Sequence, residues 1–371
     1  MQNHQPSPKP SLADHLHRLI KATGPLTIHR YMAEALGNPK FGYYTTQNPI
    51  GAKGDFITAP EVSQMFGELV GLWCADTWKS LGSPSPFNWV EIGPGRGTLM
   101  RDAYRAAGTL SEFRNNANVH LVETSPVLRE YQREALPDID VKWHEHFHQI
   151  PSGPTIVVAN EMFDALPIHQ FERTIRGWHE RRVDTDGCVN GFRFVLGPVS
   201  AAFALVPDTL RTAPIGSVVE VSPASVSLMR DIAERVVANM GAALIIDYGS
   251  LNSRPRDTLQ AVINHATHDV LVEPGSADLS AHVDFVSLAQ IARESGAEVW
   301  GPVLQGEFLD ELGIWNRASQ LKNEATANQS AEIDTAVKRL TEPGQMGTLF
   351  KVMAISPPGN MVPVGFSAGS C

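Results

Sequence analysis

The stretch from Asn88 to Leu99, N-W-V-E-I-G-P-G-R-G-T-L, constrains the fold more than any other part of this chain. An apolar run, typical of a buried strand, ends there in a turn with glycines at three alternate positions. Beyond the turn, apolar residues recur at helical spacing as far as Gly108. This order predicts the first strand, turn and helix of a nucleotide-binding α/β sheet, because glycine lets a ligand approach the backbone and the helix N-terminus closely.

The spacing of the glycines excludes two kinds of nucleotide site. The pattern is G-x-G-x-G, whereas a dinucleotide site has G-x-G-x-x-G and a phosphate loop continues into Lys and Ser or Thr. Thr98 stands where the dinucleotide pattern needs its third glycine. Glu91, at the end of the strand, would repel a pyrophosphate and suits a ligand with a cationic centre. On this motif alone, a glycine turn in an ordinary α/β sheet remains an alternative.

The charge balance argues against nucleic acid as a partner. The chain of 371 residues has 30 basic and 40 acidic residues, a formal charge of −10, whereas phosphate binding needs a basic surface. No apolar run approaches the roughly 20 residues that span a bilayer. The odd number of cysteines, Cys74, Cys188 and Cys371, suggests a reducing compartment and no metal cage. We therefore expect a cytosolic protein, with a cationic ligand or a basic peptide as its partner.

The periodicity along the chain predicts how the domains follow one another. We expect a disordered leader at 1–10, a helical cap with a lid loop at 11–85, an α/β domain at 86–355 and a flexible tail at 356–371. The cap has helical spacing over 11–22, 27–36 and 60–81, with Thr27 as an N-cap. Strands of the α/β domain are predicted near 88–92, 119–123, 139–143, 155–159, 242–249, 297–300 and 347–355. Short alternating runs and a turn at Asp186-Gly187 indicate a β-rich insertion at about 168–221.

The second strand ends in an acid, Glu123, followed by Thr124. A carboxylate at this point of a doubly wound sheet can accept hydrogen bonds from both ribose hydroxyls. The interval from the first glycine is longer than the usual ~20 residues, and the polar segment 111–118 accounts for the excess. We therefore expect Glu123 to hold a ribose.

Taken together, the motifs resemble the MidA family of methyltransferases, which includes the mitochondrial arginine methyltransferase that acts in assembly of respiratory complex I. The likeness runs from about Leu12 to Ile355, with one departure at Ala59, where the family usually has Ser. It rests on the segments 41–44, 54–61, 91–97, 122–123, 160–167, 246–249, 281–285 and 346–352. The resemblance implies a Rossmann-like α/β sheet of seven strands with the last one antiparallel, an N-terminal helical cap, and S-adenosyl-L-methionine as methyl donor.

The resemblance also implies residues that bind this cofactor. Its amino-acid end would lie on the backbone of the glycine turn with Glu91 near its ammonium, and Glu145, His146 and Phe147 are candidates for the adenine wall. Asp55 and Phe56, in a loop flanked by glycines, would close over the cofactor. The predicted cofactor-binding residues are Glu91, Gly93, Pro94, Gly95, Gly97, Glu123, Thr124, His146, Phe147, Asp55 and Phe56.

Asn160, Glu161 and Asp164 follow the fourth strand, where open α/β sheets bind ligands, and are the predicted catalytic residues. Their carboxylates can hold a guanidinium and steer one nitrogen towards the methyl group. The structural alternatives are that Asp164 caps a helix and that Glu161 pairs with an arginine. The alternating His144, His146 and His148 invite a metal site, but nothing else converges on them, so we expect a solvated strand edge and no metal.

Two classes of function therefore remain. The first is a protein arginine N-methyltransferase acting on a subunit of a respiratory NADH dehydrogenase, as the resemblance implies. The second is a weakly catalytic or non-catalytic assembly factor that keeps the cofactor pocket. An NAD-dependent enzyme is disfavoured by the glycine spacing.

Overall fold

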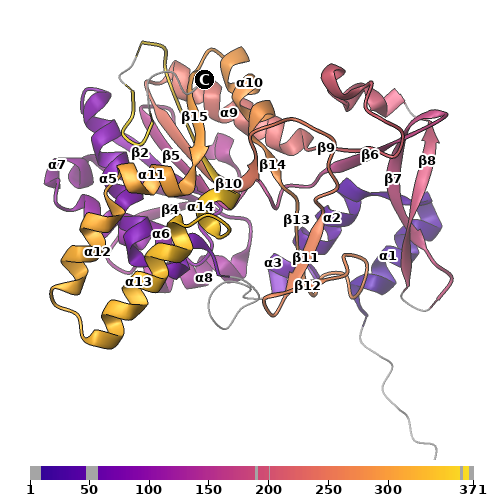
Figure 1. The fold of residues 1–371 in the computed structure, drawn as a ribbon, viewed down its shortest axis with the longest axis horizontal. Coiled ribbons are helices and arrows are strands. Elements are labelled where there is room, and N and C mark those ends of the chain that lie inside the picture. Colours follow the sequence, from indigo (N-terminus) through magenta and orange to yellow (C-terminus); the bar gives the residue numbers. More distant parts are fainter. Residues whose placement is uncertain (1–9, 47–56, 189–190, 200, 360–361, 367–371) are drawn as a thin grey trace, which may run out of the picture. The chain divides into compact units, whose positions relative to one another are not determined.

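The computed structural model describes residues 10–46, 57–188, 191–199, 201–359 and 362–366, so Asp55 and Phe56 lie outside the described residues (Figure 1). Contacts divide the chain into two compact units. The antiparallel unit consists of 1–49, 167–222 and 254–281, and the Rossmann-like unit of 50–166, 223–253 and 282–371.

The Rossmann-like unit is built on a sheet with the strand order β15-β16-β10-β5-β2-β3-β4, in which β14 pairs with the end of β10. Its strands are β2 (Phe87–Ile92), β3 (Ala117–Val122), β4 (Val141–His144), β5 (Thr155–Asn160), β10 (Ala242–Ser250), β14 (Val283–Asp284), β15 (Glu298–Leu304) and β16 (Phe350–Ser356). From β10 to β4 the neighbours are parallel, and β16 is antiparallel to both β10 and β15. The predicted seven-stranded sheet with an antiparallel last strand is confirmed.

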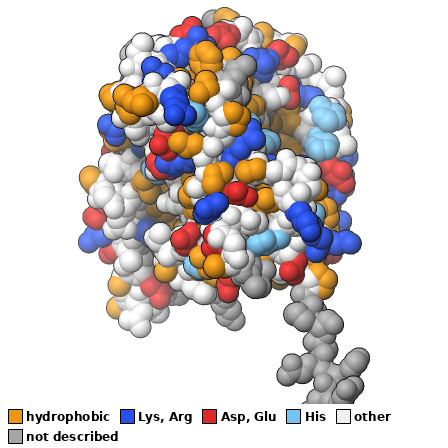
Figure 2. All heavy atoms as spheres, turned by 90° about the vertical axis from the view of Figure 1, so that its right-hand side faces the viewer, with side chains coloured by type: hydrophobic (Ala, Val, Ile, Leu, Met, Phe, Trp, Pro, Cys, Tyr) orange, Lys and Arg blue, Asp and Glu red, His pale blue; other side chains and the backbone are white. Residues whose placement is uncertain are grey.

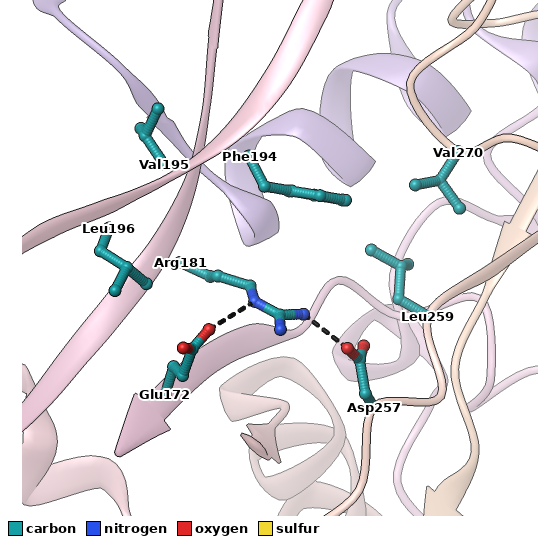
Figure 3. A pocket seen from close by; sticks show the side chains of 8 residues that line it. All are labelled: Glu172, Arg181, Phe194, Val195, Leu196, Asp257, Leu259 and Val270. Carbon is teal, nitrogen blue, oxygen red and sulfur yellow. Dashed lines mark hydrogen bonds and ion pairs between the residues drawn. The ribbon is translucent and has the colours of Figure 1, made fainter. Parts of the chain in front are cut away.

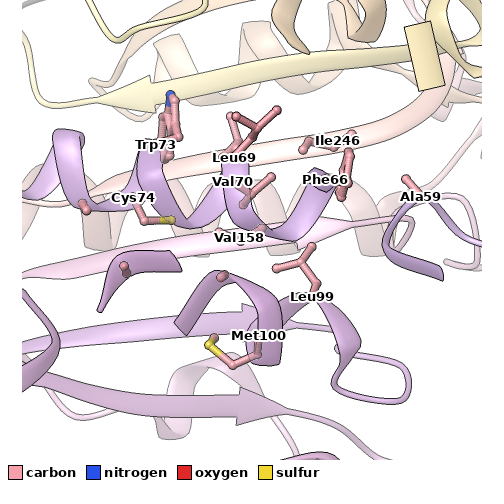
Figure 4. Close-up of a cluster of buried hydrophobic side chains, with 14 of the residues drawn as sticks. Ala59, Phe66, Leu69, Val70, Trp73, Cys74, Leu99, Met100, Val158 and Ile246 are labelled. Atoms are coloured by element: carbon pink, nitrogen blue, oxygen red, sulfur yellow. The ribbon is translucent and has the colours of Figure 1, made fainter. Parts of the chain in front are cut away.

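Both faces of this sheet are buried, which explains why its strands are nearly continuous apolar runs. In β5, Ile156 and Val158 face a core shared with α5 and α6, whereas Val157 and Ala159 face a core shared with α9 and α10. Figure 4 shows side chains of the first of these cores, in which Phe66 of α5 lies near Ile246 of the sheet. The sheet is therefore the middle of three layers.

Side-chain caps mark where several helices of this unit begin. Ser125 accepts a hydrogen bond from Leu128 at the start of α8, and Asp284 accepts from Val286 and Ser287 at the start of α10. The predicted helix at 60–81 is two helices, because Ser63 is extended and caps the second. The helices are α4 (Ala59–Val62), α5 (Gln64–Ser80), α6 (Thr98–Ala107), α7 (Ser111–Asn116), α8 (Pro126–Ala135), α9 (Pro223–Ala238), α10 (Phe285–Glu294), α11 (Gln305–Glu311), α12 (Ile314–Lys322), α13 (Ala327–Thr341) and α14 (Met346–Leu349).

The antiparallel unit combines the first helices with the β-rich insertion. Its larger sheet has the order β1-β7-β6-β9, with β8 on the other side of β7, and a smaller sheet has the order β12-β11-β13. Every strand pair in both sheets is antiparallel. The elements are α1 (Leu12–Thr23), β1 (Leu26–Thr27), α2 (Ile28–Gly37), α3 (Tyr43–Thr46), β6 (His169–Thr174), β7 (Gly177–Thr185), β8 (Phe192–Val199), β9 (Val218–Val221), β11 (Gln260–Ile263), β12 (Ala266–His268) and β13 (Asp278–Ser280).

This grouping differs from the predicted cap at 11–85. The structure assigns α1 to α3 to the antiparallel unit and α4 and α5 to the Rossmann-like unit. The reason is tertiary: Leu26 pairs with Val183 of β7, and the hydroxyl of Tyr31 donates to the carbonyl of Val270 at 2.5 Å. Neither partner can be read from the periodicity of the first 85 residues.

The described helices include none with the length and apolar character needed to cross a membrane. On the face in Figure 2, hydrophobic, basic and acidic side chains are interspersed, so the net negative charge is not gathered there into one acidic patch.

Candidate functional site

Four strands of the Rossmann-like unit end side by side at the edge that carries the predicted site. β3, β2, β5 and β10 are successive parallel neighbours, so their C-terminal ends meet at one edge of the sheet. Open α/β sheets bind their ligands at this edge, next to the first strand. The glycine turn follows β2, Glu123 follows β3, and Asn160 ends β5.

The turn after β2 requires glycine at all three positions. Gly93, Gly95 and Gly97 have φ values of 67°, 52° and 82°, in the left-handed region that side chains disfavour. A Cβ on Gly93 would lie 2.8 Å from Cγ of Met162. The amide of Gly97 donates to the carbonyl of Pro94 at 2.8 Å, and Gly97 caps α6 without a side chain. The turn therefore leaves the backbone and the N-terminus of α6 open to a ligand.

Glu91 is buried beneath this turn. Its side chain is only 2% exposed, it accepts a hydrogen bond from the backbone of Met100 in α6, and its Oε2 has no partner among the described residues. Burial raises the pKa of Glu91 to about 8, and the Met100 amide opposes this shift only in part. The carboxyl is thus neutral near pH 7 unless a cation lies nearby. Its contact with the cofactor ammonium stays a prediction.

Glu123 is held in a fixed orientation at the end of β3. Its Oε1 accepts from the amide of Ser125 at 2.7 Å, and its Oε2 accepts from Nε2 of Gln132 at 3.2 Å. Burial raises the pKa of Glu123, and these hydrogen bonds oppose the rise. Thr124 beside it is exposed. The donors to its two side-chain oxygens are both uncharged, so they orient the carboxylate without neutralising it.

Gln132, which the sequence did not single out, joins two of these strand ends to β4. Besides Glu123, its Nε2 donates to the carbonyl of Gly95 at 2.8 Å, and its Oε1 accepts from Nε1 of Trp143 in β4 at 2.9 Å. The side chain is fully buried. In the sequence Gln132 stands in a polar run of α8, so nothing local distinguishes it from its solvent-exposed neighbours.

The predicted adenine wall lies after β4. His146 precedes a short 3-10 helix at Phe147–Gln149 and stacks on His148 with ring centroids 5.4 Å apart. Phe147 is buried in the core on the α9 side of the sheet, beneath the guanidinium of Arg235. Phe147 therefore has a core position, and its contact with adenine stays a prediction.

The turn after β5 places two carboxyls and an amide close together in sequence and partly out of solvent. Glu161 has φ of 51°, uncommon for a residue with a side chain, and its Oε1 accepts from the amide of Ala59 at 2.8 Å and from Nδ2 of Asn160 at 3.1 Å. Oδ1 of Asn160 is buried without a hydrogen-bond partner among the described residues. Strain of this kind costs of order 1–3 kcal/mol and is found mainly at functional sites.

Asp247, at the end of β10, holds this turn in place. Its Oδ2 accepts from the amides of Met162, Phe163 and Asp164 at 2.9–3.2 Å, and its Oδ1 from the amide of Tyr248 at 2.8 Å. No helix begins within 161–168, so the alternative that Asp164 caps a helix is wrong. In the sequence, the only sign of this role is that an acid ends the apolar run 242–246.

Asp164 and Asp247 share this buried setting. Burial raises the pKa of Asp164 to about 6, although the hydroxyl of Tyr248 hydrogen-bonds to it, and Oδ1 of Asp164 has no partner among the described residues. Burial and repulsion from Asp164 and Glu161 also raise the pKa of Asp247. The backbone donors on Asp247 favour its charged form and oppose this rise.

A second segment, α4, touches both the glycine turn and the β5 turn. Oγ1 of Thr98, the first residue of α6, donates to Oε1 of Glu61 at 2.5 Å, while the amide of Ala59 donates to Glu161. Ala59 is fully buried and acts through its backbone. The departure from Ser at this position therefore leaves that hydrogen bond intact.

The histidines of β3 and β4 form a hydrogen-bonded pair inside the sheet. Nδ1 of His120 lies 2.9 Å from Nε2 of His144, and Nε2 of His120 lies 3.1 Å from Oδ1 of Asn88 in β2. No group of three or more potential ligands among residues 10–46, 57–188, 191–199, 201–359 and 362–366 could hold a metal ion. His144 thus has a structural partner in β3.

Comparison with known proteins gives consistent matches along the chain. The family described as "Putative S-adenosyl-L-methionine-dependent methyltransferase" matches residues 69–303. The mitochondrial protein arginine methyltransferase NDUFAF7 homolog of Drosophila melanogaster is 39% identical over 380 residues, covering 94% of this chain and 85% of that protein. Human mitochondrial protein arginine methyltransferase NDUFAF7 is 37% identical over 381 residues, covering 95% and 84%.

A solved structure is also similar over nearly its whole length. A protein from Burkholderia thailandensis, solved bound to S-adenosyl-homocysteine, superposes with a TM-score of 0.83 at 28% identity, covering 95% of this chain and 93% of that one. A native structure from the same organism gives 0.82 at 29% identity, covering 96% and 94%.

Proposed function

The chain belongs to this family of S-adenosyl-L-methionine-dependent methyltransferases, and from that premise we propose that it methylates an arginine side chain of a protein. We propose further that the substrate is a subunit of a respiratory NADH dehydrogenase. The relatives named as protein arginine methyltransferases support the residue type. The formal charge of −10 supports a basic partner.

The residues at the sheet edge fit the cofactor, which supplies the methyl group when bound. The left-handed glycine turn leaves room for its amino-acid end on the backbone, and Gly93 has no space for a Cβ. The side-chain oxygens of Glu123 are oriented to accept from the ribose hydroxyls. Oε2 of Glu91 is buried without a hydrogen-bond partner among the described residues. A nearby ammonium would favour the charged form of this carboxyl, whose pKa burial raises.

The β5 turn carries the arginine assignment. Oδ1 of Asn160 and Oδ1 of Asp164 are buried acceptors that lack donors among the described residues, and Glu161 adds a carboxylate. A buried acceptor without a donor costs about 1–3 kcal/mol. A guanidinium carries five N–H donors in a planar fork and no acceptor, so it complements such a set.

The same groups can activate the guanidinium. Carboxylates on two of its nitrogens hold the positive charge there and leave the third nitrogen facing the methyl group. The new N–C bond forms as the S–C bond breaks, sulfur keeps the electron pair, and the nitrogen must lose a proton. The carboxylate of Glu161 is the proposed acceptor of that proton.

The proposal is tested by locating the transferred label. Purified protein is incubated with cell extract and methyl-labelled S-adenosyl-L-methionine, the proteins are digested, and the methyl group is located by mass spectrometry. The expected result is label on arginine of an NADH dehydrogenase subunit and none with Gly95→Val protein. Label on lysine, a carboxylate or a small molecule would refute the arginine assignment. No label at all would favour the alternative, an assembly factor without turnover.

A further inference from the structure

A cavity of about 510 Å³ is lined entirely by residues of the antiparallel unit. Arg181 of β7 reaches between two acids: its Nε donates to Oε2 of Glu172 at 3.2 Å, and its Nη1 donates to Oδ2 of Asp257 at 2.6 Å (Figure 3). Two carboxylates face one guanidinium, so the cavity keeps one net negative charge. Asp257 has a side chain that is 49% exposed and can meet a further cation.

The remaining walls of this cavity are apolar. Phe194 and Leu196 of β8 lie on one side of the cavity, and Leu259 and Val270 lie on another (Figure 3). Phe194 is 40% exposed and Leu196 is 43% exposed, whereas side chains in a protein core are almost wholly buried. The cavity thus combines acidic groups with an accessible apolar wall, a mixture suited to a long basic side chain with an aliphatic stem.

The strand that supplies this wall is an edge strand. Within the described residues, β8 pairs only with β7, so its other edge has unpaired backbone groups. Exposed apolar side chains continue beyond the cavity at Val199, which is 54% exposed. An open edge with exposed apolar side chains can pair with an extended peptide.

The charges distinguish between two possible occupants of this edge. A second copy of the chain would bring a formal charge of −10 to a cavity that is already negative. A basic segment of another protein would instead place a cation against Asp257 and Glu172.

We propose that the β8 edge and its cavity dock an extended segment of the protein substrate, with a Lys or Arg side chain in the cavity and apolar residues along β8. This inference rests on the proposed function in that the docked protein is the methyl acceptor. It assigns substrate recognition to the antiparallel unit, outside the residues proposed for chemistry.

The test uses the full chain and two fluorescein-labelled peptides in which Val and Ser alternate around a central Lys or a central Glu. Fluorescence anisotropy should show the Lys peptide binding about fivefold more tightly than the Glu peptide, the effect of one exposed ion pair. Leu196→Lys should remove this preference and Leu196→Glu should retain it, although both lose the same apolar contact. Ile215→Lys and Ile215→Glu, at an exposed residue outside the cavity, are the matched controls and should behave as wild type.

The outcomes separate this proposal from the proposed function. Equal binding of both peptides, or the same preference in Leu196→Lys and Leu196→Glu, would overturn the docking site even if labelled arginine is found. A preference for the Lys peptide that is present in wild type and Leu196→Glu and absent in Leu196→Lys would support the docking site, even if no methyl group is transferred. A wild-type dimer that Leu196→Lys dissociates in sedimentation would show that a second copy occupies the edge, and the proposal would be wrong. Binding of S-adenosyl-homocysteine by each variant confirms that the Rossmann-like unit is folded.

Discussion

Glu161 occupies a backbone conformation that only its surroundings can maintain. Its amide donates to the carbonyl of Ile246 at 2.9 Å, and its carboxylate accepts from the amide of Ala59, so β10 and α4 both hold it. A residue strained at the end of a central strand and tied to two other segments is well suited to a role that depends on position.

Glu161→Gln should lower methyl transfer by orders of magnitude and leave cofactor affinity nearly unchanged. Glutamine keeps an oxygen for the amide of Ala59, so the turn is preserved, but it lacks the charge proposed to orient the guanidinium and to accept its proton. Transfer is measured with labelled cofactor and affinity by calorimetry. Glu130→Gln, an exposed site on α8, is the control and should retain full activity. Full activity in Glu161→Gln would remove it from the chemistry.

Among the elements, α8 connects the strand ends that surround the proposed cofactor site. Gln132 is the contact through which it does so, because this one side chain reaches the turn after β2, the acid after β3 and the indole of β4. It acts as a positioning residue, since it touches the groups proposed to bind the cofactor.

Gln132→Met should therefore weaken binding of S-adenosyl-homocysteine without unfolding the protein. Methionine fills a similar volume but cannot donate to Gly95 or Glu123, and two lost hydrogen bonds of about 0.5–1.5 kcal/mol each predict a decrease of roughly tenfold or more. Calorimetry measures the affinity, and Gln290→Met on the exposed side of α10 is the control. Wild-type affinity in Gln132→Met would show that the glycine turn holds its shape without α8.

The pairing of β2, β3 and β4 includes a group that senses pH. Burial, together with the nearby charges of His144, Lys142 and Arg235, lowers the pKa of His120 from 6.5 to about 4. As the pH falls below 6.5, the unfolded chain takes up a proton that the folded chain refuses until about pH 4. The His120 contribution to stability is thus fully present above pH 6.5 and is lost between 6.5 and 4.

We expect His120→Gln to remove this part of the pH dependence. Urea denaturation at a series of pH values gives the free energy of unfolding, which should fall more steeply from pH 6.5 to 4 in wild type than in the variant. His148→Gln, at an exposed residue, should keep the wild-type slope. Identical slopes in wild type and His120→Gln would show that His120 is protonated in the folded protein.

For the molecule as a whole, the site predicts which ligand stabilises the folded protein. S-adenosyl-homocysteine at a hundredfold excess over its Kd should stabilise the folded state by about 2.7 kcal/mol, whereas NAD should have no effect. Differential scanning calorimetry measures both. Gly95→Val should fold yet show no stabilisation by either ligand, because a β-branched residue cannot adopt φ of 52° without strain and would obstruct the turn. Stabilisation by NAD alone would contradict the assignment of the cofactor.

The sequence by itself determined the elements that depend on neighbouring residues. The alternate glycines predicted the turn because few other residues adopt the left-handed region, and Thr27 predicted the start of α2 because its hydroxyl accepts from the amide of Arg30. Apolar runs predicted the buried strands of the parallel sheet, since both faces are covered. In each case the pattern that permits the prediction lies within a few residues of the element that it predicts.

Only the tertiary structure decided what joins these elements. Gln132 became a bridge because its side chain reaches Gly95, Glu123 and Trp143, and Asp247 became the support of the β5 turn because β10 lies beside β5. The helices α1 to α3 joined the antiparallel unit because Leu26 pairs with Val183. These contacts connect residues far apart in the chain, and a polar side chain has the same local pattern whether it meets water or a distant partner, so periodicity and spacing could not reveal them.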